Sequence, residues 1–247
     1  MTRAIILAAG QGRRLLPLTA ERPKCLLPVA GRSLLERQVD NLLAARISEV
    51  TVVTGFRADA VDALIAHLYP GRGVQTLFNP FFEVADNLAS CWLARGCMSG
   101  DFLLLNGDTL FERAVLDRVL ASPAAPVTLA IDRKDSYDDD DMKVQLEGAR
   151  LLHVSKTLPH DQVQAESIGM LYFRDKGPEL FRGAVESSLR HPTSLRLWYL
   201  SVIDTLAARG CVQSCAITGL RWSEIDFPAD LARAESLFAD DPLPGKR

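Results

Sequence analysis

Residues 4–24 read AIILAAGQGRRLLPLTAERPK, and this stretch decides the fold and the kind of site that it carries. The apolar run 4–8 predicts a buried strand, and it leads directly into a loop that holds Gly10 and Gly12. Glycine has no Cβ, so the loop backbone can turn sharply and approach a ligand closely. A strand followed at once by such a loop is typical of α/β proteins that bind a ligand at the end of a strand.

Cations follow this loop at Arg13, Arg14 and Lys24. Exposed backbone N–H groups in a tight turn bind anions, and fixed positive charges beside the turn strengthen that binding. The stretch therefore predicts a polyphosphate site. It is no dinucleotide fingerprint, because Leu15 stands where a third glycine is needed. It is no P-loop either, because two arginines follow Gly12 in place of Lys and Ser or Thr. A glycine pair that only shapes a turn would leave the cations unexplained.

The composition is that of an ordinary globular protein, with 24% charged and 48% hydrophobic residues. A net charge of −3 gives no reason to expect nucleic acid or an anionic membrane as the main partner. No apolar run is long enough to span a membrane, and the first strand begins too early to leave room for a signal peptide. Five cysteines without a close-spaced framework predict reduced thiols in a cytoplasmic protein.

Strands and helices alternate through the first half of the chain. Strands are predicted at 49–54, 74–78 and 102–105, and helices around 34–43, 61–68 and 87–97, the first with Ser33 as its N-cap. The second half is less regular, with strands at 127–131, 142–146, 151–154, 168–173, 212–216 and 222–225, several of them antiparallel, and helices at 178–189, 195–209 and 228–238. We predict an α/β fold, a single Rossmann-like, doubly wound, mostly parallel mixed sheet with helices on both faces.

Polar residues follow several of these strands, where a parallel sheet binds its ligands. The candidates are the loop 10–14 and the segments 54–56, 79–81 and 106–108. Asp108 could hold a hard divalent cation or could cap a following helix, and its position after a strand fits both interpretations equally. Asp226, between a strand and the last helix, has the same two interpretations.

The first stretch resembles the Leu-Ala-Ala-Gly-x-Gly-x-Arg-Leu-x-Pro-Leu-Thr…Pro-Lys signature of the sugar-phosphate nucleotidyltransferase family. Most of residues 3–238 is similar to its short cytidylyltransferase branch, which includes phosphocholine, aminoethylphosphonate and inositol-phosphate enzymes. The resemblance implies the nucleotide-diphospho-sugar transferase type of fold. It also implies one domain over 1–238, in which about 1–125 bind nucleotide and about 126–238 bind the acceptor. Residues 239–247 are expected to form a flexible tail.

The resemblance also assigns roles in nucleotidyl transfer. Arg14 is expected to brace the β- and γ-phosphates of a nucleoside triphosphate, and Lys24 to stabilise the charge around the α-phosphate. Asp108 and Asp226 are expected to ligate Mg²⁺, with Glu224 as a weaker candidate beside them. An acceptor phosphate or phosphonate would attack the α-phosphorus and expel pyrophosphate, without a general base because it is already ionised.

The nucleotide-binding residues implied by the family are Leu7, Ala8, Ala9, Gly10, Gly12, Arg13, Gly55, Asn87 and Ser90. Asn87 is as good a candidate for a helix cap. The branch implies CTP, although these residues by themselves leave the base open among CTP, GTP, dTTP and UTP.

Acidic residues gather where the acceptor is expected. The run Asp138–Asp141 is either a solvated loop or a patch that attracts a cationic amine. Lys143 and Lys156 follow on neighbouring strands and could bind the acceptor phosphate. Glu166 matches a family position that contacts the acceptor, and Trp198 offers either an aromatic face for a quaternary ammonium or a core side chain.

Other functions fit parts of the chain. A sugar-1-phosphate guanylyl- or thymidylyltransferase would keep the chemistry and change both substrates. A non-catalytic nucleotide-sugar sensor would not need the retained cations and carboxylates, and a glycosyltransferase would have no use for the segment 10–24. The acceptor, the pathway and the choice between monomer and homodimer stay open at this level.

Overall fold

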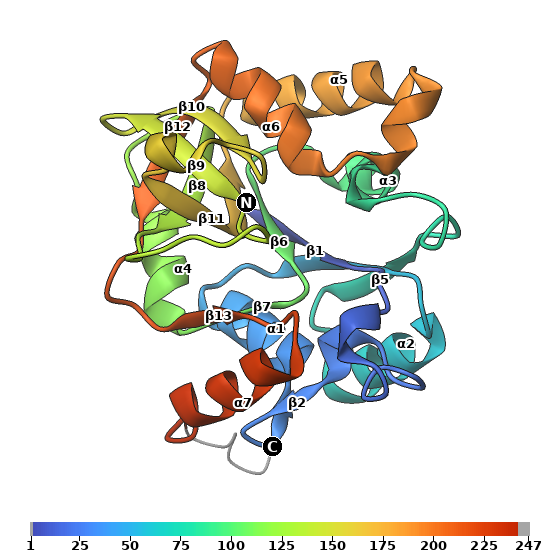
Figure 1. Cartoon of the computed structure of the whole chain (residues 1–247). Coiled ribbons are helices and arrows are strands. Elements are labelled where there is room, and N and C mark those ends of the chain that lie inside the picture. Colours follow the sequence, from blue (N-terminus) through green and yellow to red (C-terminus); the bar gives the residue numbers. More distant parts are fainter. Residues whose placement is uncertain (1, 242–247) are drawn as a thin grey trace.

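The structure is a computed structural model that describes residues 2–241. Its centre is a nine-stranded sheet of order β5-β4-β1-β6-β11-β8-β12-β10-β9 (Figure 1). The strands are β1 (Arg3–Ala8), β4 (Glu49–Thr54), β5 (Val74–Phe78), β6 (Phe102–Asn106), β8 (Val127–Asp132), β9 (Lys143–Glu147), β10 (Arg150–Ser155), β11 (Ala165–Phe173) and β12 (Val212–Ala216). Strands from both halves of the chain therefore share one sheet.

The strand order reverses at β1. β4 pairs with one side of β1 and β6 with the other, and the pairings from β5 to β6 are all parallel. In an open parallel sheet, ligands bind beyond the carboxyl ends of the strands at such a switch point. Gly10 follows β1 and Asp108 follows β6, so the topology brings both to this point.

Helices cover both faces of the sheet, as the sequence predicts (Figure 1). One face carries α3 (Asn87–Leu93), α5 (Gly177–Leu189) and α6 (Tyr199–Ala208), and the other carries α1 (Leu34–Ala44), α2 (Ala58–Leu68) and α4 (Arg113–Leu120). Successive side chains of a strand point to opposite faces. In β1, Ile5 packs with the first set of helices and Ile6 with the second. The wholly apolar strands are therefore buried on both sides.

The far end of the sheet is antiparallel. β11 runs antiparallel to β6 and β8, and β9 pairs with both β10 and β11, so the sheet curls back on itself there. The antiparallel character predicted for this half is confirmed. β12 is an exception, because it lies parallel to β8.

Three local features differ from the sequence prediction or were missed by it. The helix expected over 195–209 begins only at Tyr199, after a 3-10 turn at Pro192–Arg196 and an extended Trp198. A short strand, β7 (Thr109–Phe111), follows Asp108 and pairs with β13 (Trp222–Glu224). A hairpin of β2 (Pro28–Val29) and β3 (Arg32–Ser33) precedes α1. Strands of two or three residues are too short to show a hydrophobic period.

The C-terminal region packs beside the first helix. The last helix, α7 (Pro228–Leu237), joins a separate apolar cluster with Leu15, Leu34 and Phe238. Asp241, in the expected flexible tail, accepts hydrogen bonds from Arg37 at 2.9 Å and Arg221 at 3.1 Å. Residues 242–247 of that tail lie outside the described residues. Among residues 2–241, every helix is too short or too polar to span a lipid bilayer.

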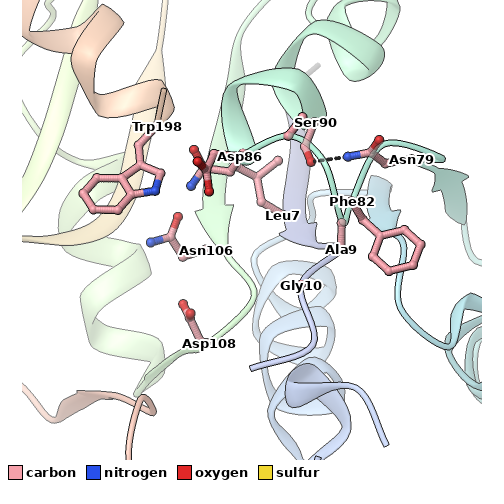
Figure 2. A pocket seen from close by; sticks show the side chains of 12 residues that line it. Leu7, Ala9, Gly10, Asn79, Phe82, Asp86, Ser90, Asn106, Asp108 and Trp198 are labelled. Carbon is pink, nitrogen blue, oxygen red and sulfur yellow. Dashed lines mark hydrogen bonds between the residues drawn. The ribbon is translucent and has the colours of Figure 1, made fainter. Parts of the chain in front are cut away.

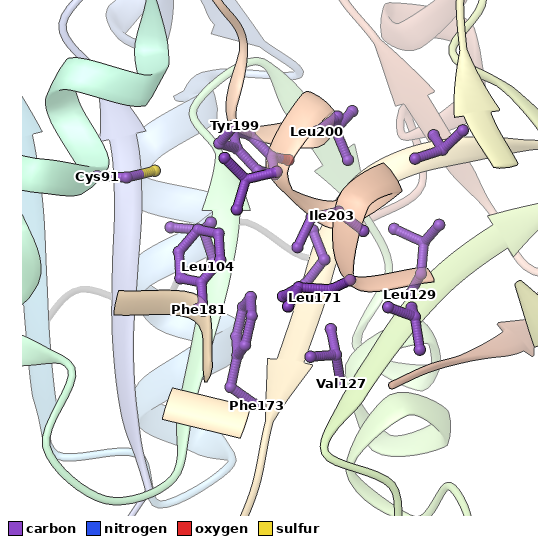
Figure 3. Packing of buried hydrophobic residues seen from close by; sticks show 14 of the residues in the cluster. Cys91, Leu104, Val127, Leu129, Leu171, Phe173, Phe181, Tyr199, Leu200 and Ile203 are labelled. Carbon is purple, nitrogen blue, oxygen red and sulfur yellow. The ribbon is translucent and has the colours of Figure 1, made fainter. Parts of the chain in front are cut away.

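Phenylalanine rings anchor the packing of α5 on the sheet, and Figure 3 shows two of them, Phe173 and Phe181. The ring of Phe173 stacks on that of Phe102 with centroids 4.4 Å apart, and its centroid lies 4.6 Å from that of Phe181.

Replacing Phe181 with alanine leaves a cavity far from the candidate site. We expect the substitution to lower the free energy of unfolding by about 3–5 kcal/mol. Denaturant unfolding measures this loss, and the milder Phe181→Leu serves as its control.

Candidate active site

The glycine loop packs against Lys24. Gly12 has φ +77°, and a Cβ on it would lie 2.9 Å from Cβ of Lys24. Another residue here would be strained and would push the lysine stem aside. The Thr19 hydroxyl donates to the Gly12 carbonyl at 2.9 Å and closes the loop. The loop therefore fixes the base of the Lys24 side chain.

The ammonium of Lys24 joins the two aspartates predicted as metal ligands. Its Nζ donates to Asp108 Oδ2 at 2.7 Å and to Asp226 Oδ1 at 2.6 Å, and the side chain is only 12% exposed. Burial alone would lower the pKa of Lys24, but the two carboxylates outweigh it and raise that pKa above its usual value. Burial alone would raise the pKa of Asp226, but the charges around it, that of Lys24 above all, outweigh burial and lower that pKa. Lys24 and Asp226 are therefore both charged at neutral pH.

Pairing of β7 with β13 brings these aspartates together. Thr109 lies opposite Glu224 in that ladder, and the Ile225 N–H donates to the Asp108 carbonyl at 3.2 Å. Asp226 does not cap α7, because its side chain faces Lys24 while Asp230 accepts the backbone N–H groups at the helix start. Asp108 likewise precedes a strand, so the capping interpretation is wrong for both aspartates.

Arg14 lies beside the charged group that Lys24 forms with Asp108 and Asp226. Its Nη1 is 3.5 Å from Asp226 Oδ2 and 3.4 Å from Asp140 Oδ2, and its guanidinium lies over the ring of Phe227. Glu224 is the other carboxyl here. Burial, together with the charges of Asp108 and Asp226, raises the pKa of Glu224 to about 8, so it is protonated at neutral pH.

A first pocket of about 230 Å³ opens at the carboxyl ends of β1 and β6 (Figure 2). Six of the residues predicted to bind nucleotide or metal line it, namely Leu7, Ala9, Gly10, Asn87, Ser90 and Asp108. It is also lined by Asn79, Phe82, Ala85, Asp86, Asn106 and Trp198. The segments 79–81 and 106–108 were candidates by their position after strands, whereas Phe82 and Asp86 were missed because a loop carries no periodic signal.

Hydrogen bonds orient the polar groups of this pocket. Tyr199 donates its backbone N–H to Asn87 Oδ1 at 2.8 Å and its hydroxyl to Asn106 Oδ1 at 3.0 Å. The amide NH₂ groups of both asparagines are thereby available as donors. Asn79 Nδ2 donates to the Ser90 hydroxyl at 3.0 Å. Asn87 does not cap its helix, so the capping alternative is wrong.

Four predicted nucleotide contacts lie outside the lining of the first pocket, and one of them is Gly12, which packs against Lys24. Ala8 is buried in β1. Gly55 packs so closely that a Cβ on it would lie 2.6 Å from the Ala9 carbonyl oxygen. Arg13 lies in the 3-10 turn Arg13–Leu15 and is not among the residues that line this pocket.

A second pocket of about 330 Å³ lies beyond Asp226. Most of its lining side chains are acidic: Asp138, Asp140, Asp141, Glu166, Glu224, Asp226 and Asp230, with Lys134, Arg233, Trp222, Ser223 and Phe227 completing it. Lys134 Nζ lies 2.7 Å from Asp141 Oδ1 and 3.0 Å from Glu166 Oε2. Burial and a hydrogen bond with Asp141 raise the pKa of Glu166 to about 7. The acidic run thus forms a wall of this pocket.

The remaining predicted acceptor residues lie elsewhere. Lys143 is 1% exposed, and its Nζ donates to the carbonyl of Lys156 at 3.0 Å. Lys156 Nζ is 3.1 Å from Asp140 Oδ1 and 4.6 Å from the ring centre of Trp198. Trp198 is 40% exposed, on the wall of the first pocket (Figure 2). The structure therefore brings Glu166 to the second pocket and Trp198 to the first.

The two aspartates fit a divalent cation that is completed by substrate. Within residues 2–241, no group of three or more His, Cys, Asp or Glu side chains is arranged to hold a metal. Mg²⁺, however, is commonly bound by one or two carboxylates together with substrate phosphates and water. Asp108 Oδ1 is buried and has no hydrogen-bond partner in the described part of the chain. That oxygen, with those of Asp226, is a suitable donor set.

Residues 4–209 match the model of the MobA-like NTP transferase domain. The chain is 32% identical over 243 residues to CMP-5′-(3-aminopropyl)phosphonate synthase of Streptomyces rubellomurinus, covering 96% of this chain and 39% of that protein. It is 27% identical over 246 residues to the bifunctional IPC transferase and DIPP synthase of Aquifex aeolicus, covering 98% of this chain and 53% of that protein.

The chain thus spans about half the length, or less, of these curated relatives. Among solved structures, CTP:phosphocholine cytidylyltransferase from Streptococcus pneumoniae is similar with a TM-score of 0.79 at 19% identity, over 96% of this chain and 99% of that one. This likeness confirms the predicted fold. The match over residues 4–209 agrees with the resemblance seen in the glycine loop, and this chain belongs to the family of MobA-like NTP transferase domains.

Proposed function

We propose that this protein is a Mg²⁺-dependent cytidylyltransferase that joins CTP to a small amine-bearing phosphate or phosphonate. The products are a CMP-linked compound and pyrophosphate. One observation carries the proposal: Asp108 lines the first pocket, Asp226 lines the second, and Lys24 contacts both aspartates. The charged group therefore lies between two pockets, where a nucleotide and an acceptor would meet.

The chain's own residues suit this reaction. An acceptor oxygen forms a bond to the α-phosphorus, and the bond from that phosphorus to the β-phosphate oxygen breaks. Both reactants are anions, so catalysis consists mainly of neutralising their repulsion and holding them in line. Lys24 and Arg14 supply positive charge for this purpose. None of the four histidines lines either pocket, in keeping with an acceptor that needs no general base.

Mg²⁺ bound by Asp108 and Asp226 would neutralise charge on the phosphates. Lys24 must then give up its present contacts with these carboxylates, and the triphosphate offers its ammonium new oxygen partners.

The second pocket supports a cationic acceptor. Its lining contains seven carboxyl groups and two cations, so its potential attracts an ammonium and repels a plain sugar phosphate, which carries only negative charge. Trp222 and Phe227 add aromatic surface. The relative from S. rubellomurinus is named for a CMP-linked aminopropylphosphonate, which also combines cytidylate with an amine.

An activity matrix tests this function. Purified protein is incubated with Mg²⁺, one of CTP, UTP, GTP or dTTP, and one of phosphocholine, aminoethylphosphonate, inositol phosphate or a hexose 1-phosphate, while pyrophosphate release is followed. We expect release with CTP and an amine-bearing acceptor. Release only with a hexose phosphate and GTP or dTTP would overturn the proposal in favour of the sugar-nucleotide alternative.

Asp86 is expected to read the base. It lines the first pocket near Leu7 (Figure 2), and a carboxylate accepts from the exocyclic amine that cytosine has and uracil lacks. We expect Asp86→Asn to reduce the preference for CTP over UTP by about 10- to 100-fold, the effect of one good base contact. The ratio of kcat/KM for the two nucleotides measures it. Asp175→Asn, at an exposed position outside the lining of both pockets, is the control and should leave the ratio unchanged.

A further inference from the structure

The Lys24 ammonium occupies the space between two carboxylates that the proposed function needs for a metal. We propose that Lys24 acts as an internal counter-ion that keeps Asp108 and Asp226 closed to divalent cations until a nucleoside triphosphate draws the ammonium away. This inference rests on the proposed function. It adds a second role for Lys24, which would control when the metal site becomes available.

Geometry shows why the ammonium and a divalent cation compete. Nζ of Lys24 takes one oxygen of each aspartate, at 2.7 and 2.6 Å. The other carboxylate oxygen of Asp226, Oδ2, lies 3.5 Å from Nη1 of Arg14. The other oxygen of Asp108, Oδ1, is buried and has no hydrogen-bond partner among residues 2–241. A cation entering here would bring two further positive charges against an ammonium in a weakly solvated site, and like charges at such distances repel strongly.

The Lys24 stem allows the ammonium to move without moving the loop. Its Cβ, Cγ and Cδ pack against the backbone at Gly12, while its Nζ bonds only to the two carboxylates in the described part of the chain. Lysine carries its charge on a flexible four-carbon stem. The phosphates of a nucleotide in the first pocket would add several negative charges beside Asp108. The ammonium would turn toward these phosphates.

Mn²⁺ binding provides a readout that does not depend on turnover. Free Mn²⁺ is measured by electron paramagnetic resonance in titrations of the wild type, Lys24→Met, the double variant Lys24→Met/Asp108→Asn, and Lys176→Met as a control for loss of a surface lysine. Methionine keeps most of the stem that packs on Gly12. Each protein is titrated alone, and the wild type also with CTP. Thermal unfolding of each protein verifies that it is folded.

We expect the wild type and Lys176→Met to bind Mn²⁺ weakly without nucleotide. Lys24→Met should bind it at least about 10-fold more tightly, since a competing cation is gone, and its unfolding temperature should rise with Mn²⁺. Asp108→Asn in the same background should abolish this gain. If Lys24→Met is folded and binds Mn²⁺ no better than the wild type does, the inference is wrong.

The same titrations separate this inference from the proposed function. Wild type that binds Mn²⁺ with CTP, while Lys24→Met shows no gain alone, rejects only the counter-ion role. Wild type that binds no Mn²⁺ even with CTP rejects the metal site of the proposed function, and the counter-ion role with it.

Discussion

Lys24→Met is expected to lower kcat for nucleotidyl transfer by about 10²- to 10³-fold, as the loss of one preorganised electrostatic contact does in other active sites. The residue is nearly buried, its charge is held by Asp108 and Asp226, and under the proposed function it stabilises the charge around the α-phosphate. Pyrophosphate release at saturating CTP and acceptor measures the effect. Lys176→Met, which removes an exposed lysine outside both candidate pockets, should retain the wild-type rate.

This substitution has two opposite expected effects. Mn²⁺ should bind more tightly to Lys24→Met in the absence of nucleotide, whereas turnover should fall. A general loss of structure would weaken both properties, so the combination is specific to a charge that competes with the metal and also serves the reaction. A rate within a few-fold of the wild type would count against Lys24 as a catalytic residue.

Asp108→Asn is expected to lower kcat by about 10²-fold or more, because a neutral amide is a poor substitute for a carboxylate that neutralises and orients a divalent cation. The buried Oδ1 of Asp108 would be left as a weaker ligand, and Lys24 would keep only Asp226 as a charged partner. Initial rates over a range of Mg²⁺ concentrations measure the effect. We expect a much higher Mg²⁺ requirement as well as a lower maximum rate.

Asp117→Asn is the matched control for this experiment. Asp117 lies on α4 and pairs with Arg113 one helical turn away, as an exposed ion pair that contributes little to stability. Its amide variant should keep the wild-type rate and Mg²⁺ requirement. An Asp108→Asn enzyme with an unchanged Mg²⁺ requirement would contradict the metal assignment even if its rate were reduced.

Much of the central sheet could be predicted because its strands are apolar and its first helices are amphipathic. The strands over 49–54, 74–78 and 212–216 have the predicted bounds. Ser33 forms the predicted N-cap, with a capping box to Glu36. Each of these features depends on a local pattern of side chains, and burial in the sheet only reinforces it.

The start of α6 could not be predicted in the same way. Apolar residues continue through 195–209 at helical spacing, so the sequence favours one helix. Backbone bonds from Asp86 N–H to the Leu195 carbonyl and from Leu88 N–H to the Leu197 carbonyl hold this segment against α3 instead. Trp198 is extended as a result and lines the first pocket. A tertiary contact thus overrode the local propensity.

The α/β fold, the glycine loop after the first strand and the residue types of the candidate site could all be predicted from the sequence. These depend on hydrophobic period and on the chemistry of single side chains, which are local properties. The position of Lys24 between Asp108 and Asp226, the second of which is 202 residues away in the chain, depends on the three-dimensional fold. That meeting depends on pairing between β7 and β13, strands of three residues each, whose position is set by long-range hydrogen bonds and packing and not by any pattern of their own.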